Sequence, residues 1–211
     1  MTLRQPSAAA RLPIAAGDPL SERVERARRG DQIAREELAT WCRRAAYLLA
    51  LQLLRDPEDA LDVAQDSALR FFSNLHRFEP GRAVKPWLFA IVRNRVRDLK
   101  RWRRVRLHEP LDGLTGEDRP EIVDLSPGPE GTAEQRQLQA RLWQAVNQLT
   151  DGQREILILR DYQDLSYQEI ARVLSIPQGT VMSRLHRARK ALRSTLSDLD
   201  EAGEISMSGG M

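Results

Sequence analysis

The sequence has little of several things that mark particular protein classes. Cys42 is its only cysteine, so an intramolecular disulfide is excluded and a cysteine-rich metal site would lack ligands. The three histidines, His76, His108 and His186, are scattered and share no metal-ligand spacing. No run of about 18 apolar residues occurs and the N-terminus lacks a signal-peptide core, so we expect a cytoplasmic protein without a membrane span. These absences also lead us to expect no metal and no cofactor.

Charge, by contrast, is abundant. Charged residues make up 30% of the 211-residue chain and aromatic residues only 5%, a composition typical of helical domains with small cores and large solvated surfaces. The net charge is only +3, although the sequence pI is about 9.4, so the distribution of charge matters more than its sum. A chain of this length can form one domain of ordinary size or two small ones.

Two amphipathic helices near the C-terminal end form the clearest motif. Ser166 and Glu169 make a capping box that opens a short helix, and Pro177 requires that helix to stop near Ser175. After the break, apolar residues recur at helical spacing and leave a basic face opposite them. Two such helices joined by a tight turn are typical of a helix-turn-helix, whose second helix fits the major groove of DNA. The alternative is an ordinary helical hairpin with a solvated basic face.

Helical patterns also fill the N-terminal half, from about Leu20 onward. Asp31 and Asp56 are suitable N-caps, and Pro57 is suitable for a first helical position. The helix that Asp56 opens carries an acidic and amide surface at helical spacing. We call these four residues the acidic surface: Asp59, Asp62, Gln65 and Asp66. By itself such a surface usually means only that the helix face is solvated.

A basic segment follows this helix. Pro80 and Gly81 force a turn in a loop that mixes a histidine, an aromatic ring and basic groups, which suits single-stranded nucleic acid. Pro86 is then expected to begin a further helix. Between residues 77 and 106 Lys and Arg far outnumber the acids, of which there are only Glu79 and Asp98. Such a density of like charge favours a polyanionic partner.

The charge then inverts, which divides the chain. Residues 107–133 are acidic and rich in Pro and Gly, so they indicate a flexible linker between two helical domains. We therefore predict an all-α fold whose two small domains span residues 20–106 and 134–197. The two ends, 1–19 and 198–211, are expected to be disordered.

Three segments in this order resemble the extracytoplasmic-function group of the sigma-70 family of bacterial sigma factors. They are Glu-Asp-Ala-Leu-Asp-Val-Ala-Gln-Asp from Glu58, Trp-Leu-Phe-Ala-Ile-Val-Arg-Asn from Trp87, and the helix-turn-helix of residues 165–192. The resemblance covers about Ser21 to Leu196 and implies the domains called region 2 and region 4, without a region 3 domain. It also implies a non-enzymatic subunit that directs core RNA polymerase to promoters and opens the −10 duplex.

The resemblance assigns residues to three partners. The acidic surface would dock on the β′ clamp of core RNA polymerase, region 4 would meet the β flap, and an anti-sigma factor would cover these surfaces in the inactive state. Contacts to the −10 element are expected from His76, Arg77, Phe78, Arg82, Lys85, Trp87, Arg93, Asn94 and Arg97. Contacts to the −35 element are expected from Gln178, Thr180, Ser183, Arg184, Arg187 and Lys190. Met182 stands where many relatives carry a basic residue, so one −35 contact is in doubt.

Two other classes of protein are weighed against this hypothesis. A conventional helix-turn-helix regulator with an N-terminal sensing domain would bind DNA by itself and would not need the acidic surface. A nucleic-acid enzyme is disfavoured because the sequence has no paired carboxylates in an acid/base setting, no metal constellation and no phosphate-binding Gly loop. The promoter sequence and the identity of an anti-sigma factor are not encoded in any recognisable motif.

Overall fold

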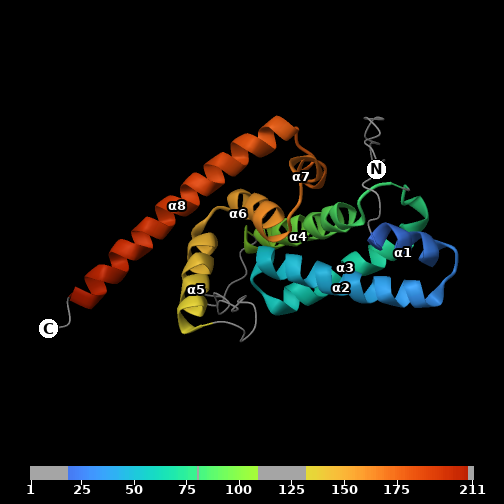
Figure 1. Ribbon diagram of the computed structural model, residues 1–211, viewed down its shortest axis with the longest axis horizontal. Helices are drawn as coiled ribbons and strands as arrows, with labels where there is room; N and C mark the ends of the chain where they lie inside the picture. The colour runs from blue at the N-terminus through green and yellow to red at the C-terminus, as the bar shows by residue number, and fades with distance from the viewer. Residues whose placement is uncertain (1–18, 80, 109–131, 209–211) are drawn as a thin grey trace.

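The structure is a computed structural model that describes residues 19–79, 81–108 and 132–208. Every regular element in these ranges is a helix, as the sequence predicts, and the helices form two domains (Figure 1). None of them is long and apolar enough to cross a membrane. The N-terminal domain contains α1 (Pro19–Arg28), α2 (Gln32–Leu54), α3 (Pro57–Ser73), the 3-10 turn η1 (Leu75–Arg77) and α4 (Val84–His108). The C-terminal domain contains α5 (Ala133–Gln148), α6 (Asp151–Leu157), the π-helical η2 (Ile158–Tyr162), α7 (Tyr167–Leu174) and α8 (Gln178–Ser208).

The helices of the N-terminal domain begin at locally specified caps. The Asp31 carboxylate accepts a hydrogen bond from the backbone N–H of Ala34 at 3.0 Å, which caps α2. Asp56 caps α3 in the same way, and Pro57 occupies the first turn. Both predicted caps are thus confirmed.

The apolar faces of α1 to α4 close on one core. Phe71 and Phe89 are among its largest fully buried side chains, and the centroids of the Phe71 and Trp87 rings lie 4.5 Å apart. Cys42 is buried within this core, where it packs as a small apolar side chain. Burial of a large apolar side chain such as Phe71 or Phe89 stabilises the fold by about 1.5–3 kcal/mol.

The C-terminal domain contains the predicted helix-turn-helix. Ser166 and Glu169 form the capping box of α7, and Ser175 takes a left-handed conformation (φ 54°) at the turn before α8. On α8, the apolar residues Val181 and Leu185 are buried against the rest of the domain. The helix-turn-helix prediction is confirmed in its elements and in the position of its turn.

Three details differ from the sequence-based expectations. Helix α4 begins at Val84 instead of Pro86, which is possible because proline is tolerated within the first turn. Helix α6 continues directly into the π-helical η2, which no local sequence pattern predicts. Helix α8 continues to Ser208, so helical geometry extends beyond residue 198, where we expected order to end. The expected disordered segment 1–19 and the linker 107–133 lie almost wholly outside the described residues.

The two domains meet along α4, which faces α6 and α7 (Figure 1). The more buried of two ion pairs joins Arg93 Nε to Glu155 Oε1 at 2.9 Å. A second ion pair joins Lys100 to Asp151 at 2.8 Å. Further hydrogen bonds run from Arg55 to the Asn147 carbonyl, from Lys85 to the Gln163 carbonyl, and from Gln163 to the Gln52 side chain. We call this set of contacts the domain contact.

Candidate functional site

The acidic surface is divided into two pairs by its contacts with α4. Asp62 and Gln65 are exposed on α3, flanked by the exposed apolar side chains of Leu61 and Leu69. A free carboxylate and amide beside exposed leucines form a surface suited to a protein partner with basic and apolar groups. Asp62 and Gln65 are thus the members of the acidic surface that remain available.

The other two members, Asp59 and Asp66, form ion pairs with arginines of α4. Asp66 pairs with Arg95, and Asp59 accepts a hydrogen bond from Arg103 Nη2 at 2.6 Å. Burial raises the pKa of Asp59, although the positive charge of Arg103 opposes this shift. In this conformation both carboxylates fix α3 to α4, a role that spacing along α3 does not reveal.

A cavity of about 380 Å³ lies between the loop of residues 74–83 and α4. His76, Arg77 and Arg82 are exposed on the loop, and Asn94 is exposed on α4. A ring, an amide and several guanidinium groups therefore converge on one open cavity, which suits an unpaired base and its phosphates. The described residues that line it are Arg70, Asn74, Arg77, Phe78, Glu79, Arg82, Trp87, Ile91 and Asn94.

Phe78 differs from its expected role. We expected its ring to be free for stacking on a base, but the residue is only 4% exposed, and its ring centroid lies 5.3 Å from that of Trp87. The ring forms part of the wall of the cavity and of the core behind it. The half-buried Trp87 is packed between Phe78 and Phe71. The aromatic groups here stabilise the cavity, while the polar groups of the loop face solvent.

Lys85 and Arg93, both expected at the −10 element, are engaged in the domain contact. The Lys85 ammonium donates to the Gln163 carbonyl at 2.7 Å, and Arg93 forms the ion pair with Glu155. Burial lowers the pKa of Lys85, and the nearby Asp164 carboxylate opposes that shift. Arg97, by contrast, is exposed. The structure thus does not bring all the expected −10 residues to one accessible surface.

The exposed face of α8 carries the residues expected at the −35 element. Gln178, Ser183, Arg184, Arg187 and Lys190 are exposed, while Thr180 is partly buried. The Ser183 hydroxyl donates to the Thr180 carbonyl at 3.1 Å, and Arg187 Nε donates to the Ser183 carbonyl at 3.3 Å.

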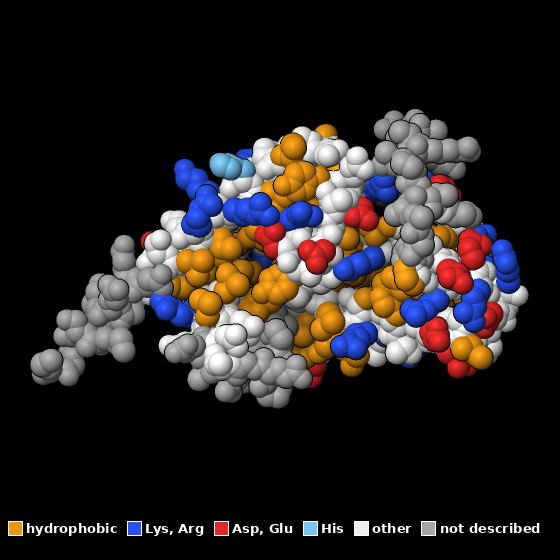
Figure 2. Space-filling view, viewed as in Figure 1, with side chains coloured by type: hydrophobic (Ala, Val, Ile, Leu, Met, Phe, Trp, Pro, Cys, Tyr) orange, Lys and Arg blue, Asp and Glu red, His pale blue; other side chains and the backbone are white. Residues whose placement is uncertain are grey.

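Met182 lies on the same face and is 53% exposed. Figure 2 shows Lys and Arg side chains gathered over α8 and the neighbouring α7. Helix α8 therefore presents a basic face, and the major groove of DNA is wide enough to admit an α-helix.

Sequence reasoning missed several residues of these surfaces. Arg70 and Asn74 line the cavity from the end of α3, and their i, i+4 spacing is the signal that could have placed them on one face. Arg28 of α1 also contacts the loop, through the carbonyls of His76 and Phe78. No sequence pattern indicates that contact, because it joins segments far apart in the chain.

Comparison with known proteins identifies both domains. Residues 38–106 match the family model "Sigma-70 region 2", and residues 139–192 match "Sigma-70, region 4". The chain is 30% identical over 190 residues to the ECF RNA polymerase sigma factor SigW of Bacillus subtilis, covering 85% of this chain and 98% of SigW. It is 32% identical over 184 residues to the RNA polymerase sigma-H factor of Pseudomonas aeruginosa, covering 83% and 93% of the two chains.

Two solved structures have a similar fold. The sigma factor RpoE of Bartonella quintana, in complex with the anti-sigma factor NepR, matches with a TM-score of 0.64 and 29% identity, covering 77% of this chain and 96% of RpoE. CnrH in complex with the cytosolic domain of CnrY matches with a TM-score of 0.62 and 26% identity, covering 86% and 99%. The chain therefore belongs to the extracytoplasmic-function group of the sigma-70 family and is an RNA polymerase sigma factor.

Proposed function

We propose that this sigma factor acts in the cytoplasm as a promoter-specificity subunit that binds core RNA polymerase, reads the −35 and −10 elements and opens the −10 duplex. It carries out no catalysis of its own in this proposal. The observation that supports the −10 assignment best is the open cavity beside Trp87, with Arg77 and Arg82 at its rim. Its residues combine apolar walls with cations at the entrance, a combination typical of single-stranded nucleic-acid sites. One of these cations, Arg82, is paired here with the Glu79 carboxylate, so it would have to exchange that partner for a phosphate.

Opening of the −10 element follows from a balance of two terms. Unstacking and extruding a base from the duplex costs a few kcal/mol. A base held against the half-buried Trp87 ring would regain about 1–3 kcal/mol from stacking, and the cations of the loop would bind its phosphates. Asn94 offers an amide at the same cavity for hydrogen bonds to a base edge. Capture of the extruded base can therefore offset the cost of opening without ATP.

Reading of the −35 element is assigned to the exposed face of α8. Arg184 and Arg187 are exposed there, and an arginine can donate two hydrogen bonds to the O6 and N7 atoms of guanine. Gln178, Thr180, Ser183 and Lys190 would contact phosphates or further base edges. Met182 can offer only apolar contact, for example to a thymine methyl group.

Docking on core RNA polymerase is assigned to Asp62 and Gln65, with Leu61 and Leu69 beside them. The β′ clamp is the proposed partner of this α3 surface, and the β flap is the proposed partner of region 4. The sigma factor RpoE was solved in complex with the anti-sigma factor NepR, and CnrH was solved in complex with the cytosolic domain of CnrY. We extend this to the present chain and propose that an anti-sigma factor covers its polymerase-binding surfaces.

The test is run-off transcription with purified core RNA polymerase on a pool of genomic promoter fragments. The wild-type protein should produce discrete new start sites, and Asp62→Arg should abolish them by reversing the charge of the docking surface. The matched control is Glu36→Arg, which makes the same charge change at an exposed site on α2. No new starts with the wild-type protein, together with sequence-specific DNA binding by the protein alone, would favour a conventional helix-turn-helix regulator.

A further inference from the structure

The loop of residues 74–83 has little secondary structure of its own to hold it. Among its described residues, the regular structure is the three-residue turn η1, and the backbone hydrogen bonds that close it locally run from Arg77 to Asn74, from Phe78 to Leu75 and from Arg82 to Glu79. Yet this loop carries the cations that rim the cavity. A binding loop of this kind must be held in position by neighbouring elements if it is to accept a base in one geometry.

Helix α1 supplies that support from behind the loop. Arg28 donates from Nη1 to the Phe78 carbonyl at 3.3 Å and from Nη2 to the His76 carbonyl at 3.4 Å. The Ser21 hydroxyl donates to the Arg82 carbonyl at 3.3 Å. One helix therefore contacts the loop backbone at three of its residues.

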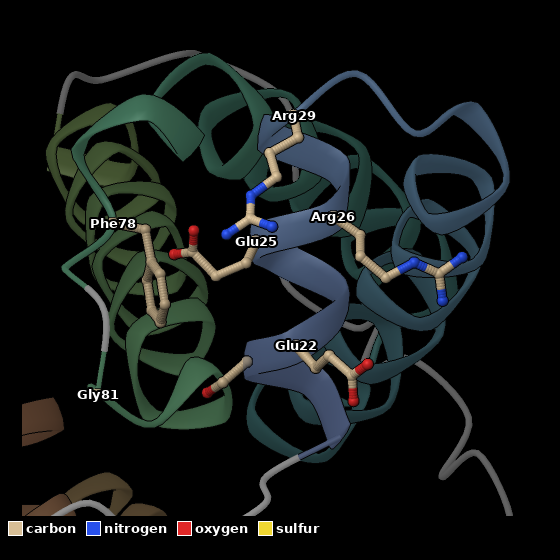
Figure 3. A pocket seen from close by; sticks show the side chains of 7 residues that line it. Glu22, Glu25, Arg26, Arg29, Phe78 and Gly81 are labelled. Atoms are coloured by element: carbon tan, nitrogen blue, oxygen red, sulfur yellow. The ribbon is translucent and has the colours of Figure 1, made fainter.

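Arg28 is itself held in place by its own helix. The Glu25 carboxylate accepts a hydrogen bond from Arg28 Nη1 at 3.0 Å, one turn earlier along α1. A guanidinium has a planar fork of donors, so it can bridge two carbonyls and a carboxylate at once, which a lysine ammonium cannot do in the same geometry. Figure 3 shows α1 beside Phe78 and Gly81, with the Glu25 side chain directed toward Phe78.

From these contacts we infer that Arg28 is a positioning residue for base capture at the −10 element: it fixes the backbone of the 76–78 segment, and so the shape of the cavity, without touching DNA. The inference rests on the proposed function. It assigns a role in promoter opening to α1, which neither the acidic surface nor the basic face of α8 includes. The carbonyls lie on the α1 side of the loop, while the side chains of His76 and Arg77 are exposed to solvent.

The test measures how strongly holoenzyme depends on the captured base. The probes are single-stranded oligonucleotides of the −10 nontemplate strand from a promoter found by run-off transcription, with an abasic site placed at each position in turn. For wild type, losing the captured base should weaken binding by roughly five- to a hundredfold, as expected for a stacked base. In Arg28→Ala this ratio should shrink about fivefold or more, since a misplaced loop no longer recognises the base.

The ratio is chosen because a loss of folded protein changes both affinities equally and leaves it unchanged. Arg23→Ala is the matched control, since it removes the same charge from α1 but at a side chain that pairs with Glu37 of α2. Arg28→Lys keeps the charge without the bidentate geometry, and should also lower the ratio. It provides the test if Arg28→Ala does not fold.

The outcomes separate the inference from the proposed function. If wild type shows a position-specific abasic effect and both Arg28 variants keep it in full, the positioning role is wrong while the sigma-factor assignment to the −10 element stands. If Arg23→Ala loses the effect to the same extent, charge on α1 and not loop geometry is responsible, and the inference is again wrong. If wild type shows no position-specific effect at all, the proposed base capture itself fails.

Discussion

Arg154 should be a large single contributor to the stability of the C-terminal domain. It is 3% exposed, and its guanidinium donates to three carbonyls at the end of α5: Leu149 at 2.8 Å, Asn147 at 3.0 Å and Val146 at 3.3 Å. The last carbonyls of a helix have no partner within the helix. Arg154 therefore acts as a buried C-cap supplied by the next helix, with the 61% exposed Asp151 carboxylate at 3.3 Å as its only counter-ion among the described residues.

The size of the effect follows from these contacts. A hydrogen bond to a charged group is worth about 1.5–3 kcal/mol, and a buried carbonyl left without a donor costs about 1–3 kcal/mol. Without Arg154, Arg55 would still donate to the Asn147 carbonyl and the Leu149 N–H to the Val146 carbonyl, so the Leu149 carbonyl is the one that would lose its donor. Two of the three hydrogen bonds have ordinary lengths. Burial of the charged guanidinium costs free energy, which offsets part of their contribution, and the same burial lowers the pKa of Arg154. Arg154→Met, which keeps the apolar stem, should lower the free energy of unfolding of this domain by about 3 kcal/mol.

Urea titration followed by circular dichroism measures the loss, and hydrogen exchange of the α5 amides assigns it to the C-terminal domain. Arg154→Lys should lose an intermediate amount, because one ammonium cannot reach all three carbonyls. Arg172→Met provides the control, since Arg172 is exposed on α7. A loss below about 1 kcal/mol for Arg154→Met, or a loss equal to that of the control, would refute the reasoning.

Three further predictions concern the core, a helix cap and the domain contact. Burial raises the pKa of the Cys42 thiol to about 12, so the native protein should not react with a disulfide reagent at mildly alkaline pH, whereas the unfolded protein should react fully. Asp56→Ala should lower stability by about 1 kcal/mol in thermal denaturation, because it removes the side-chain acceptor for the Asp59 N–H. Burial would raise the pKa of Asp151, but the hydrogen bond and charge of Lys100 hold it below its ordinary value. Because the folded-state pKa is depressed, this ion pair stabilises the domain contact above about pH 4 and is lost as pH falls through the folded-state pKa, which energy transfer between dyes on the two domains would detect.

Each of these three predictions could be contradicted by a specific result. Rapid modification of Cys42 in the native protein would mean that the core opens far more often than its packing implies. An unchanged melting temperature for Asp56→Ala would mean that Pro57 and the core alone define the start of α3. Asp151→Asn should remove the acid dependence of the domain contact, and a variant that retained it would show that another group is responsible.

The local features of this fold could be predicted because they are encoded within a few residues. The capping box of Ser166 and Glu169 and the cap at Asp56 depend only on side chains three positions apart. The helix-turn-helix could be placed because Pro177 limits where the first helix can end. In the same way, the exposed basic face of α8 follows from helical periodicity.

Features that depend on contacts between distant segments could not be predicted. Asp66 is spaced like an exposed residue of α3, yet Arg95 from α4 holds it. The aromatic ring of Phe78 matched the composition of a stacking loop, but it is buried against Trp87 of α4. Lys85 is bound by a carbonyl of the other domain. In each case a partner on another element, which periodicity along one segment does not reveal, decides which groups remain accessible.

The domain contact sets a requirement on promoter geometry. Two DNA elements centred about 25 base pairs apart are separated by roughly 85 Å along B-form DNA, whereas here Arg93 of one domain touches Glu155 of the other. The two binding surfaces belong to domains that are joined here by ion pairs and hydrogen bonds. If both elements can be occupied only when these contacts break, apparent promoter affinity is the intrinsic affinity multiplied by the fraction of molecules in which they are broken. A stronger domain contact would then lower the apparent affinity for such a promoter, and a weaker one would raise it.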